Sequence, residues 1–168
     1  KSSAASDVYK RQTMSHKKVC MVSSTGGHFM ELMQLIPALD DINFYIVTEK
    51  NPSTVQIVEQ YPHYYLIQQQ RRGWMFPFKF AYNIIISMIY LLKENPSTII
   101  TTGAGASYPT CKWAKILGKK IIYIESFAKL NSESVTGRMI YPFADKFFVQ
   151  WPEMLSVYPN AEYHGTVY

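Results

Sequence analysis

The chain has 168 residues, 48% of them hydrophobic and 17% charged, and its formal net charge at pH 7 is +5. This length is typical of one domain with a sizeable core and is short for a two-lobed enzyme. A mild positive charge could suit an anionic membrane or a pyrophosphate substrate, but it is too weak to indicate a nucleic-acid-binding protein. With only two cysteines, Cys20 and Cys111, the sequence predicts neither a disulfide framework nor a cysteine metal site, and it indicates a reducing, cytosolic environment.

The opening segment, KSSAASDVYKRQT, lacks apolar periodicity and resembles cloning read-through. We therefore expect residues 1–13 to be a disordered, non-native leader and residues 14–168 to form one domain.

 Without the leader, 17 − 3 = 14 basic and 12 − 1 = 11 acidic residues leave a net charge of +3. No signal peptide follows Met14, and the longest uncharged apolar stretch, residues 80–92, is shorter than the roughly 20 residues that span a bilayer.

Short apolar runs alternate with longer helical patterns along the domain. Several runs are continuously apolar, as in strands that are covered on both faces, so the alternation predicts an α/β fold with a doubly wound, mostly parallel sheet. The predicted strands are 18–23, 42–48, 64–67, 98–102, 120–125 and 146–150, and the predicted helices are 28–39, 53–61, 77–94, 107–117, 134–142 and 152–158.

A glycine-rich turn joins the first predicted strand to the first helix, with the sequence Thr25-Gly26-Gly27-His28. Two glycines let a ligand approach the backbone closely, and free amides at a helix start favour phosphate or another anion. We therefore expect an anion at Thr25, Gly26 and Gly27, with His28 beside it as a possible general base. The alternative is that His28 only caps its helix or binds a carbonyl.

Two more polar loops follow later strands. The run Thr102-Gly103-Ala104-Gly105 follows the fourth strand, and Glu125-Ser126 follows the fifth. Ligands of open α/β sheets bind beyond the carboxyl ends of the strands, where the strand order reverses. If the first and fourth strands are neighbours, the two glycine loops face each other there. Glu125 could instead pair with a neighbouring cation.

A nicotinamide-binding site is an alternative, because Glu49 lies 22 residues beyond Gly27, near the position of a ribose-binding acid. The dinucleotide fingerprint requires G-x-G-x-x-G. In this chain the two glycines are adjacent and are followed by His28, so the pattern does not match.

Basic and aromatic residues precede the longest apolar helix. Such residues are typical of an interfacial membrane contact, with rings at the headgroups and cations near the lipid phosphates. For residues 80–92 themselves, we expect a buried helix that crosses the sheet. The predicted membrane-contact residues are Arg71, Arg72, Trp74, Phe76 and Lys79.

Aromatic residues also gather near the end of the chain, at Trp151, Tyr158, Tyr163 and Tyr168. They could complete the core or form a partner surface, since aromatic side chains are enriched at interfaces.

Four segments together carry a family resemblance. GGHFMEL (26–32), TTGAGAS (101–107), the long run IESFAKLNSESVTGRMIYPFADKFFVQWPEML (124–155) and the terminal YHGTVY resemble the PssD-type subunits of bacterial capsular and exopolysaccharide glycosyltransferases. These are similar to the membrane-recruiting subunit of the split GlcNAc transferase that acts on dolichol-pyrophosphate oligosaccharide. Both resemble the N-terminal lobe of the MurG-type transferases, so the resemblance implies a single Rossmann-like, N-terminal-type lobe of a GT-B glycosyltransferase.

The resemblance also implies roles for individual residues. Gly26, Gly27 and His28 match the family's glycine-glycine-histidine turn, in which the histidine is the proposed base. The remaining matches are predicted to bind the acceptor: Gly103, Ala104 and Gly105 in the second glycine loop, and Glu125, Ser126 and Asn131 in the acidic segment.

The resemblance finally implies a two-chain, inverting enzyme. A separate partner would hold most of the UDP-sugar donor, and this chain would bind an undecaprenyl-pyrophosphate-linked sugar at the cytoplasmic face of the membrane. No metal or tightly bound cofactor is implied, because no Asp-x-Asp pair stands at a strand end. The alternative is a non-catalytic scaffold that localises and enhances a catalytic partner.

Overall fold

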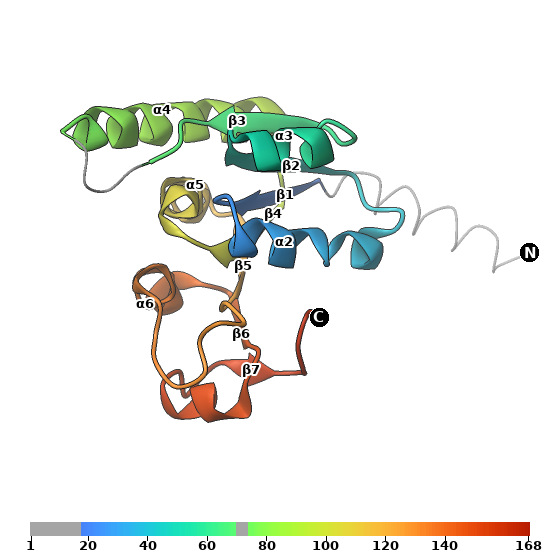
Figure 1. Ribbon diagram of the computed structural model, residues 1–168, viewed down its shortest axis with the longest axis vertical. Helices are drawn as coiled ribbons and strands as arrows, with labels where there is room; N and C mark the ends of the chain where they lie inside the picture. The colour runs from blue at the N-terminus through green and yellow to red at the C-terminus, as the bar shows by residue number, and fades with distance from the viewer. Residues whose placement is uncertain (1–17, 70–73) are drawn as a thin grey trace, which may run out of the picture.

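The computed structural model describes residues 18–69 and 74–168. The predicted leader, residues 1–13, and two predicted membrane-contact residues, Arg71 and Arg72, lie outside this part of the chain. Figure 1 shows the strands following one another from β3 near the top to β7 near the bottom. The strands are β1 (Val19–Ser23), β2 (Phe44–Glu49), β3 (His63–Leu66), β4 (Thr98–Gly103), β5 (Lys120–Ile124), β6 (Lys146–Val149) and β7 (Glu162–Tyr163).

Five α-helices and several short 3-10 turns connect these strands in the described residues. The α-helices are α2 (Gly27–Met33), α3 (Pro52–Val58), α4 (Phe76–Glu94), α5 (Tyr108–Ile116) and α6 (Val135–Ile140). The 3-10 turns are η1 (Ile36–Leu39), η2 (Gly105–Ser107), η3 (Tyr141–Phe143) and η4 (Pro152–Ser156).

All strand pairs are parallel, and the strand order is β3-β2-β1-β4-β5-β6-β7. The order therefore reverses between β1 and β4, which are neighbours with Ser23 opposite Gly103. Since the carboxyl ends of parallel strands lie at one edge, the loops after β1, β4 and β5 leave the sheet side by side. The prediction that the two glycine loops face each other is confirmed.

The core has two parts, one on each face of the sheet. Alternate residues of β1 divide between them, because successive side chains of a strand point to opposite faces. Met21 packs with Phe29 and Leu32 of α2, whereas Cys20 and Val22 pack with residues of α4 and α5. Helices therefore cover both faces, which confirms the predicted doubly wound fold.

Local signals explain where several helices begin and end. The side chain of Asn51 accepts a hydrogen bond from the Ser53 backbone ahead of α3, and Pro52 takes the first helical position. Asn95 ends α4 in the left-handed conformation with φ +44°, directly before Pro96.

Three predicted helices were too long. Residues 28–39 divide into α2 and η1, residues 134–142 into α6 and η3, and residues 152–158 form only the 3-10 turn η4. Each 3-10 turn has a proline in its first turn, which removes a backbone donor from a continuing α-helix. The two-residue strand β7 was not predicted.

Helix α4 differs most from its prediction. Its buried positions include Asn83 and Ser87, whereas Phe78 and Ile85 are 65% and 62% exposed. The exposed large apolar residues follow each other at intervals of three and four, so they share one face of the helix: Phe78, Tyr82, Ile85, Ile89 and Leu92. The expectation that residues 80–92 would be buried was therefore wrong for this outer face.

Candidate functional site

The first glycine turn lies at the carboxyl edge of β1. Gly26 has φ +78°, a conformation that favours glycine, and it precedes the first residue of α2, Gly27. A Cβ atom at either glycine would meet nothing within 4 Å. Packing within the chain therefore does not require these two glycines, and the space beside the backbone is open to a ligand. Thr25 is half-buried beside them.

His28 joins this turn to the end of β4. Its Nδ1 lies 2.8 Å from the Thr102 carbonyl oxygen, and the Thr102 hydroxyl donates to the His28 carbonyl oxygen at 2.6 Å. A carbonyl can only accept, so in the neutral ring Nδ1 carries the proton and Nε2 has the lone pair. The half-buried His28 is thus held in the tautomer that a base acting through Nε2 requires.

The second glycine turn is conformationally unusual. Gly103 has φ +97°, and a Cβ there would lie 2.6 Å from the Tyr123 hydroxyl. Ala104 has φ +66° and ψ +158°, a region that is essentially restricted to glycine and costs about 1–3 kcal/mol for other residues. Strain of this kind is common in loops that bind ligands. Gly105 then begins η2 at the same edge.

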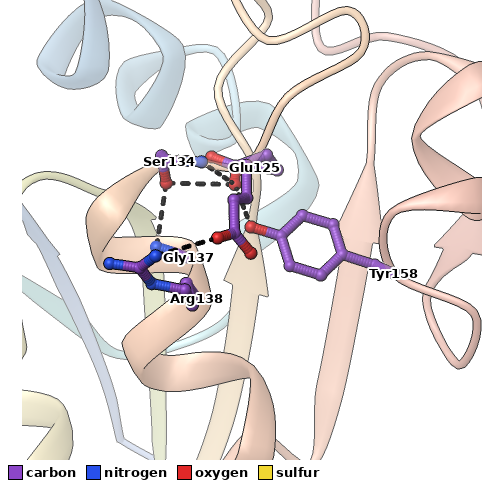
Figure 2. Close-up of polar contacts among 6 residues, drawn as sticks. Glu125, Ser134, Gly137, Arg138 and Tyr158 are labelled. Atoms are coloured by element: carbon purple, nitrogen blue, oxygen red, sulfur yellow. Dashed lines mark hydrogen bonds and ion pairs between the residues drawn. The ribbon is translucent and has the colours of Figure 1, made fainter.

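Glu125 follows β5 and is completely buried. Its Oε1 accepts from the Ser126 backbone at 2.9 Å. Its Oε2 accepts from the hydroxyls of Tyr158 at 2.8 Å and Ser134 at 3.0 Å (Figure 2). Burial and the nearby Glu125 charge raise the pKa of Tyr158, so this hydroxyl stays protonated and able to donate. All these contacts are within the chain, and the geometry therefore supports an organising role for Glu125 rather than a direct contact with the acceptor.

The other residues predicted in this segment lie on its loop. Ser126 is buried, whereas Asn131 is exposed between Ser126 and α6. Ser134 closes the loop: its hydroxyl accepts from the backbone nitrogen of Gly137 in the first turn of α6 at 2.8 Å.

Glu31 is a buried carboxylate that the sequence analysis did not identify. It lies three residues after His28 on α2, is only 3% exposed, and its Oε1 accepts from the Ser126 hydroxyl and the Phe127 backbone. Its Oε2 is buried and has no hydrogen-bond partner among the described residues. Burial raises the pKa of Glu31, and the hydrogen bonds from the Phe127 backbone and the Ser126 hydroxyl, together with the nearby His28, oppose that shift. A signal was present, since residues i and i+3 share a helix face, but the contact with Ser126 depends on the tertiary fold.

Glu49 lies at the carboxyl end of β2, as the nicotinamide alternative requires. It is buried, however, and its carboxylate accepts from the Ser24 hydroxyl and the Gln69 backbone, both at 2.8 Å. Glu49 therefore links the segment after β1 to the segment after β3 and does not face a ribose site.

The predicted membrane-contact residues that the structure describes lie at the start of α4. Trp74 is 83% exposed, Lys79 is half-buried, and Phe76 stacks on Phe80 with ring centroids 5.8 Å apart. In residues 18–69 and 74–168, no helix has both the length and the apolar character needed to cross a membrane.

The aromatic residues near the chain end differ in their burial. Tyr158 belongs to the core, and the Trp151 indole donates to the Phe127 carbonyl at 2.6 Å. Tyr163 and Tyr168 are exposed.

The fold is similar to solved structures of sugar-nucleotide enzymes. MurG from Acinetobacter baumannii matches with a TM-score of 0.72 and 18% identity over 89% of this chain and 45% of MurG. UDP-N-acetylglucosamine 2-epimerase from Rickettsia bellii matches with a TM-score of 0.69 and 15% identity over 90% of this chain and 45% of the epimerase. The chain thus spans less than half the length of both enzymes and has the Rossmann-like fold of one lobe.

Sequence comparison gives a closer relationship. The subunit alg14 of the UDP-N-acetylglucosamine transferase of Schizosaccharomyces pombe is 31% identical over 178 aligned residues, which cover 90% of this chain and 83% of the relative. The mouse ALG14 subunit is 25% identical, with 89% and 82% coverage. The family model described as "Oligosaccharide biosynthesis protein Alg14 like" matches residues 19–167. Over residues 19–167, the chain therefore belongs to the Alg14-like family of oligosaccharide biosynthesis proteins.

Proposed function

We propose that this chain is the acceptor-side subunit of a two-chain, UDP-sugar-dependent glycosyltransferase and that His28 is its general base. The observation that carries the proposal is the Nδ1 contact of His28 with the Thr102 carbonyl at the edge where both glycine turns meet. This contact leaves Nε2 unprotonated, as a base requires.

In the proposed reaction, Nε2 of His28 accepts the proton of the acceptor hydroxyl. The hydroxyl oxygen forms a bond to the anomeric carbon of the donor, the bond from that carbon to the UDP oxygen breaks, and UDP leaves with the electron pair. The backbone at Thr25, Gly26 and Gly27, together with the turn at Gly103, Ala104 and Gly105, holds the acceptor's pyrophosphate. These roles are supported by the open space at Gly26 and Gly27.

The comparisons support UDP-N-acetylglucosamine as the donor, because the related subunits are named for transferases of that sugar. We propose that a partner chain holds the donor, because the related proteins are named as subunits of a UDP-N-acetylglucosamine transferase. Among the described residues, there is no group of three or more histidine, cysteine, aspartate or glutamate side chains that could hold a metal ion.

We further propose that the acceptor is a polyprenyl-pyrophosphate-linked sugar at the cytoplasmic face of the membrane. The PssD resemblance favours an undecaprenyl carrier and capsule or exopolysaccharide assembly, whereas the relatives named above are eukaryotic Alg14 subunits. The exposed apolar face of α4, with Trp74 at one end, supports peripheral membrane contact.

The test is turnover by the complex of this chain with its donor-binding partner. His28→Ala should lower kcat by about 100-fold or more, the usual contribution of a general base, while the complex still forms. His63→Ala is a matched control, because His63 Nδ1 also lies 2.8 Å from a backbone carbonyl, that of Tyr61, but at the start of β3. Near-normal turnover with His28→Ala would instead support the scaffold alternative.

A further inference from the structure

The described surface has an apolar groove that leads away from the second glycine turn. We propose that this groove binds the first isoprene units of a polyprenyl pyrophosphate, an assignment that rests on the proposed acceptor function. The groove lies between α4 on one side and α5 and α6 on the other.

Two adjoining hollows make up the groove, and both are lined by Phe80 and Tyr108. The hollow near the sheet edge measures about 200 Å³ and also contains Gly105 and Met139 in its lining. The second measures about 140 Å³ and extends to Ile116 at the end of α5. Because the hollows share two walls, they form one track from the glycine turn to the outer surface of α5.

The ends of the track differ in chemistry. At the glycine turn, Gln69 lines the groove, and its buried side-chain nitrogen has no hydrogen-bond partner among the described residues. An unpaired buried donor is unfavourable until an acceptor such as a phosphate oxygen reaches it. The far end is apolar, with Trp113 and the exposed Ile116. The groove thus matches a ligand with phosphate at one end and hydrocarbon at the other.

The size of the track favours a single chain over a protein segment. An α-helix with its side chains is about 10–12 Å wide, and hollows of this volume hold no such helix. Hydrogen bonds between α4 and α5 fix the width of the groove. The Trp113 indole donates to the Ile84 carbonyl at 2.9 Å, and the Thr110 hydroxyl donates to the Ser87 hydroxyl at 3.1 Å. The glycine turn at one end favours the acceptor lipid over a membrane acyl chain.

The experiment is calorimetric binding of two probes to the full chain: dimethylallyl pyrophosphate, with one isoprene unit, and geranylgeranyl pyrophosphate, with four. The wild-type chain should bind the longer probe more tightly. Met139→Trp fills the groove from an exposed position and should reduce this preference about tenfold, as expected when about two fewer methylene groups are buried. Val135→Trp, on the same wall, should act in the same direction.

Leu155→Trp is the matched control, because Leu155 is exposed on η4 and does not line the groove; it should keep the preference. Equal affinity of the wild-type chain for both probes would overturn the proposal, as would an unchanged preference in both groove variants. If phosphatidylglycerol vesicles displace the longer probe from the wild-type chain, the groove binds membrane lipid instead. If the wild-type chain shows no length preference but His28→Ala still lowers turnover, the groove assignment is refuted and the proposed function stands.

Discussion

The carboxyl edge of the sheet and the outer face of α4 depart from the usual burial pattern in opposite directions. At the edge, Glu31, Glu49 and Glu125 are buried. On α4, Phe78 and Ile85 are exposed, while Asn83 and Ser87 lie inside. Charged residues are rarely buried without partners, and large exposed apolar patches mark interaction sites. Neither arrangement is the one that stability alone would favour, which indicates function at both places.

The two regions differ in how the departure is compensated. At the edge, hydrogen bonds within the chain satisfy most of the buried oxygens, as for Glu125 with Tyr158 and Ser134. The outer face of α4 has no such compensation within the described residues, and its apolar side chains remain in contact with solvent. The edge is therefore a preorganised polar arrangement, whereas the α4 face is an exposed apolar surface. Stability should depend on the first region and association on the second.

The largest effect is expected from Gly137→Ala in the Glu125 cluster. A Cβ there would lie 2.2 Å from Glu125 Oε2 and 2.6 Å from the Tyr158 hydroxyl, so the cluster must shift or lose contacts. We expect a destabilisation of about 3 kcal/mol in urea unfolding, within the range for overpacking a core. Val135→Ala on the exposed side of the same helix should change stability by less than about 0.5 kcal/mol. Equal midpoints for Gly137→Ala and the wild type would show that the cluster contributes no stability.

On α4, the double substitution Ile85→Gln and Ile89→Gln should separate stability from association. Both side chains are exposed, so the free energy of unfolding should change by less than about 0.5 kcal/mol per site. Binding to phosphatidylglycerol vesicles, measured by co-sedimentation, should fall about tenfold through lost apolar burial. Leu155→Gln, an exposed apolar residue on η4, is the control that should retain binding. Unchanged vesicle binding by the α4 variant would show that this face of α4 does not contact the membrane.

Ala104→Gly should stabilise the chain, because Ala104 has a backbone conformation that suits glycine. Relief of the strain, less the entropy that glycine adds to the unfolded chain, should raise the unfolding free energy by about 1 kcal/mol. Ala38→Gly, at an exposed position of η1, should instead lower it slightly. A stability loss with Ala104→Gly would contradict the assignment of strain to this turn.

The smallest effect is expected from Glu31→Gln, and it depends on pH. Burial raises the pKa of Glu31 above its ordinary value of 4.5, so the folded state holds this proton more tightly than the unfolded state does. The stability that this provides is present below the unfolded pKa and is lost as pH rises through the folded pKa. Glutamine does not titrate, so the variant should gain stability relative to the wild type as the pH rises from the unfolded pKa of Glu31 through its higher folded pKa. A pH-independent difference in urea unfolding would contradict the raised pKa.

Most of the fold could be predicted from the sequence, because the apolar runs are continuous and alternate with helical patterns. The adjacency of β1 and β4 was a condition of the predicted site, and the structure fulfils it. The Glu162–Tyr163 strand could not be found, since two residues carry no periodic signal. The exposed face of α4 was not predicted, because residues 80–92 are apolar almost throughout. The two polar residues of this run, Asn83 and Ser87, instead lie inside the protein and bind Ile67 and Thr110.

At the site, the glycine turns and His28 were visible as local patterns. The roles of Glu31 and Tyr158 were not, because they depend on contacts with residues 95 and 33 positions away in the chain. Glu125 was found as a residue, but its buried, hydrogen-bonded state could only be known once α6 and Tyr158 were placed around it.

The most direct test of the account is whether the chain alone binds the acceptor and leaves the donor to its partner. Calorimetry should compare a short-chain prenyl-pyrophosphate-linked GlcNAc with UDP-N-acetylglucosamine, using the full chain without a partner. We predict measurable binding of the lipid-linked sugar and binding of the nucleotide sugar that is at least about 100-fold weaker, a difference of about 2.7 kcal/mol. Tight binding of UDP-N-acetylglucosamine with no binding of the lipid-linked sugar would contradict the acceptor-side assignment.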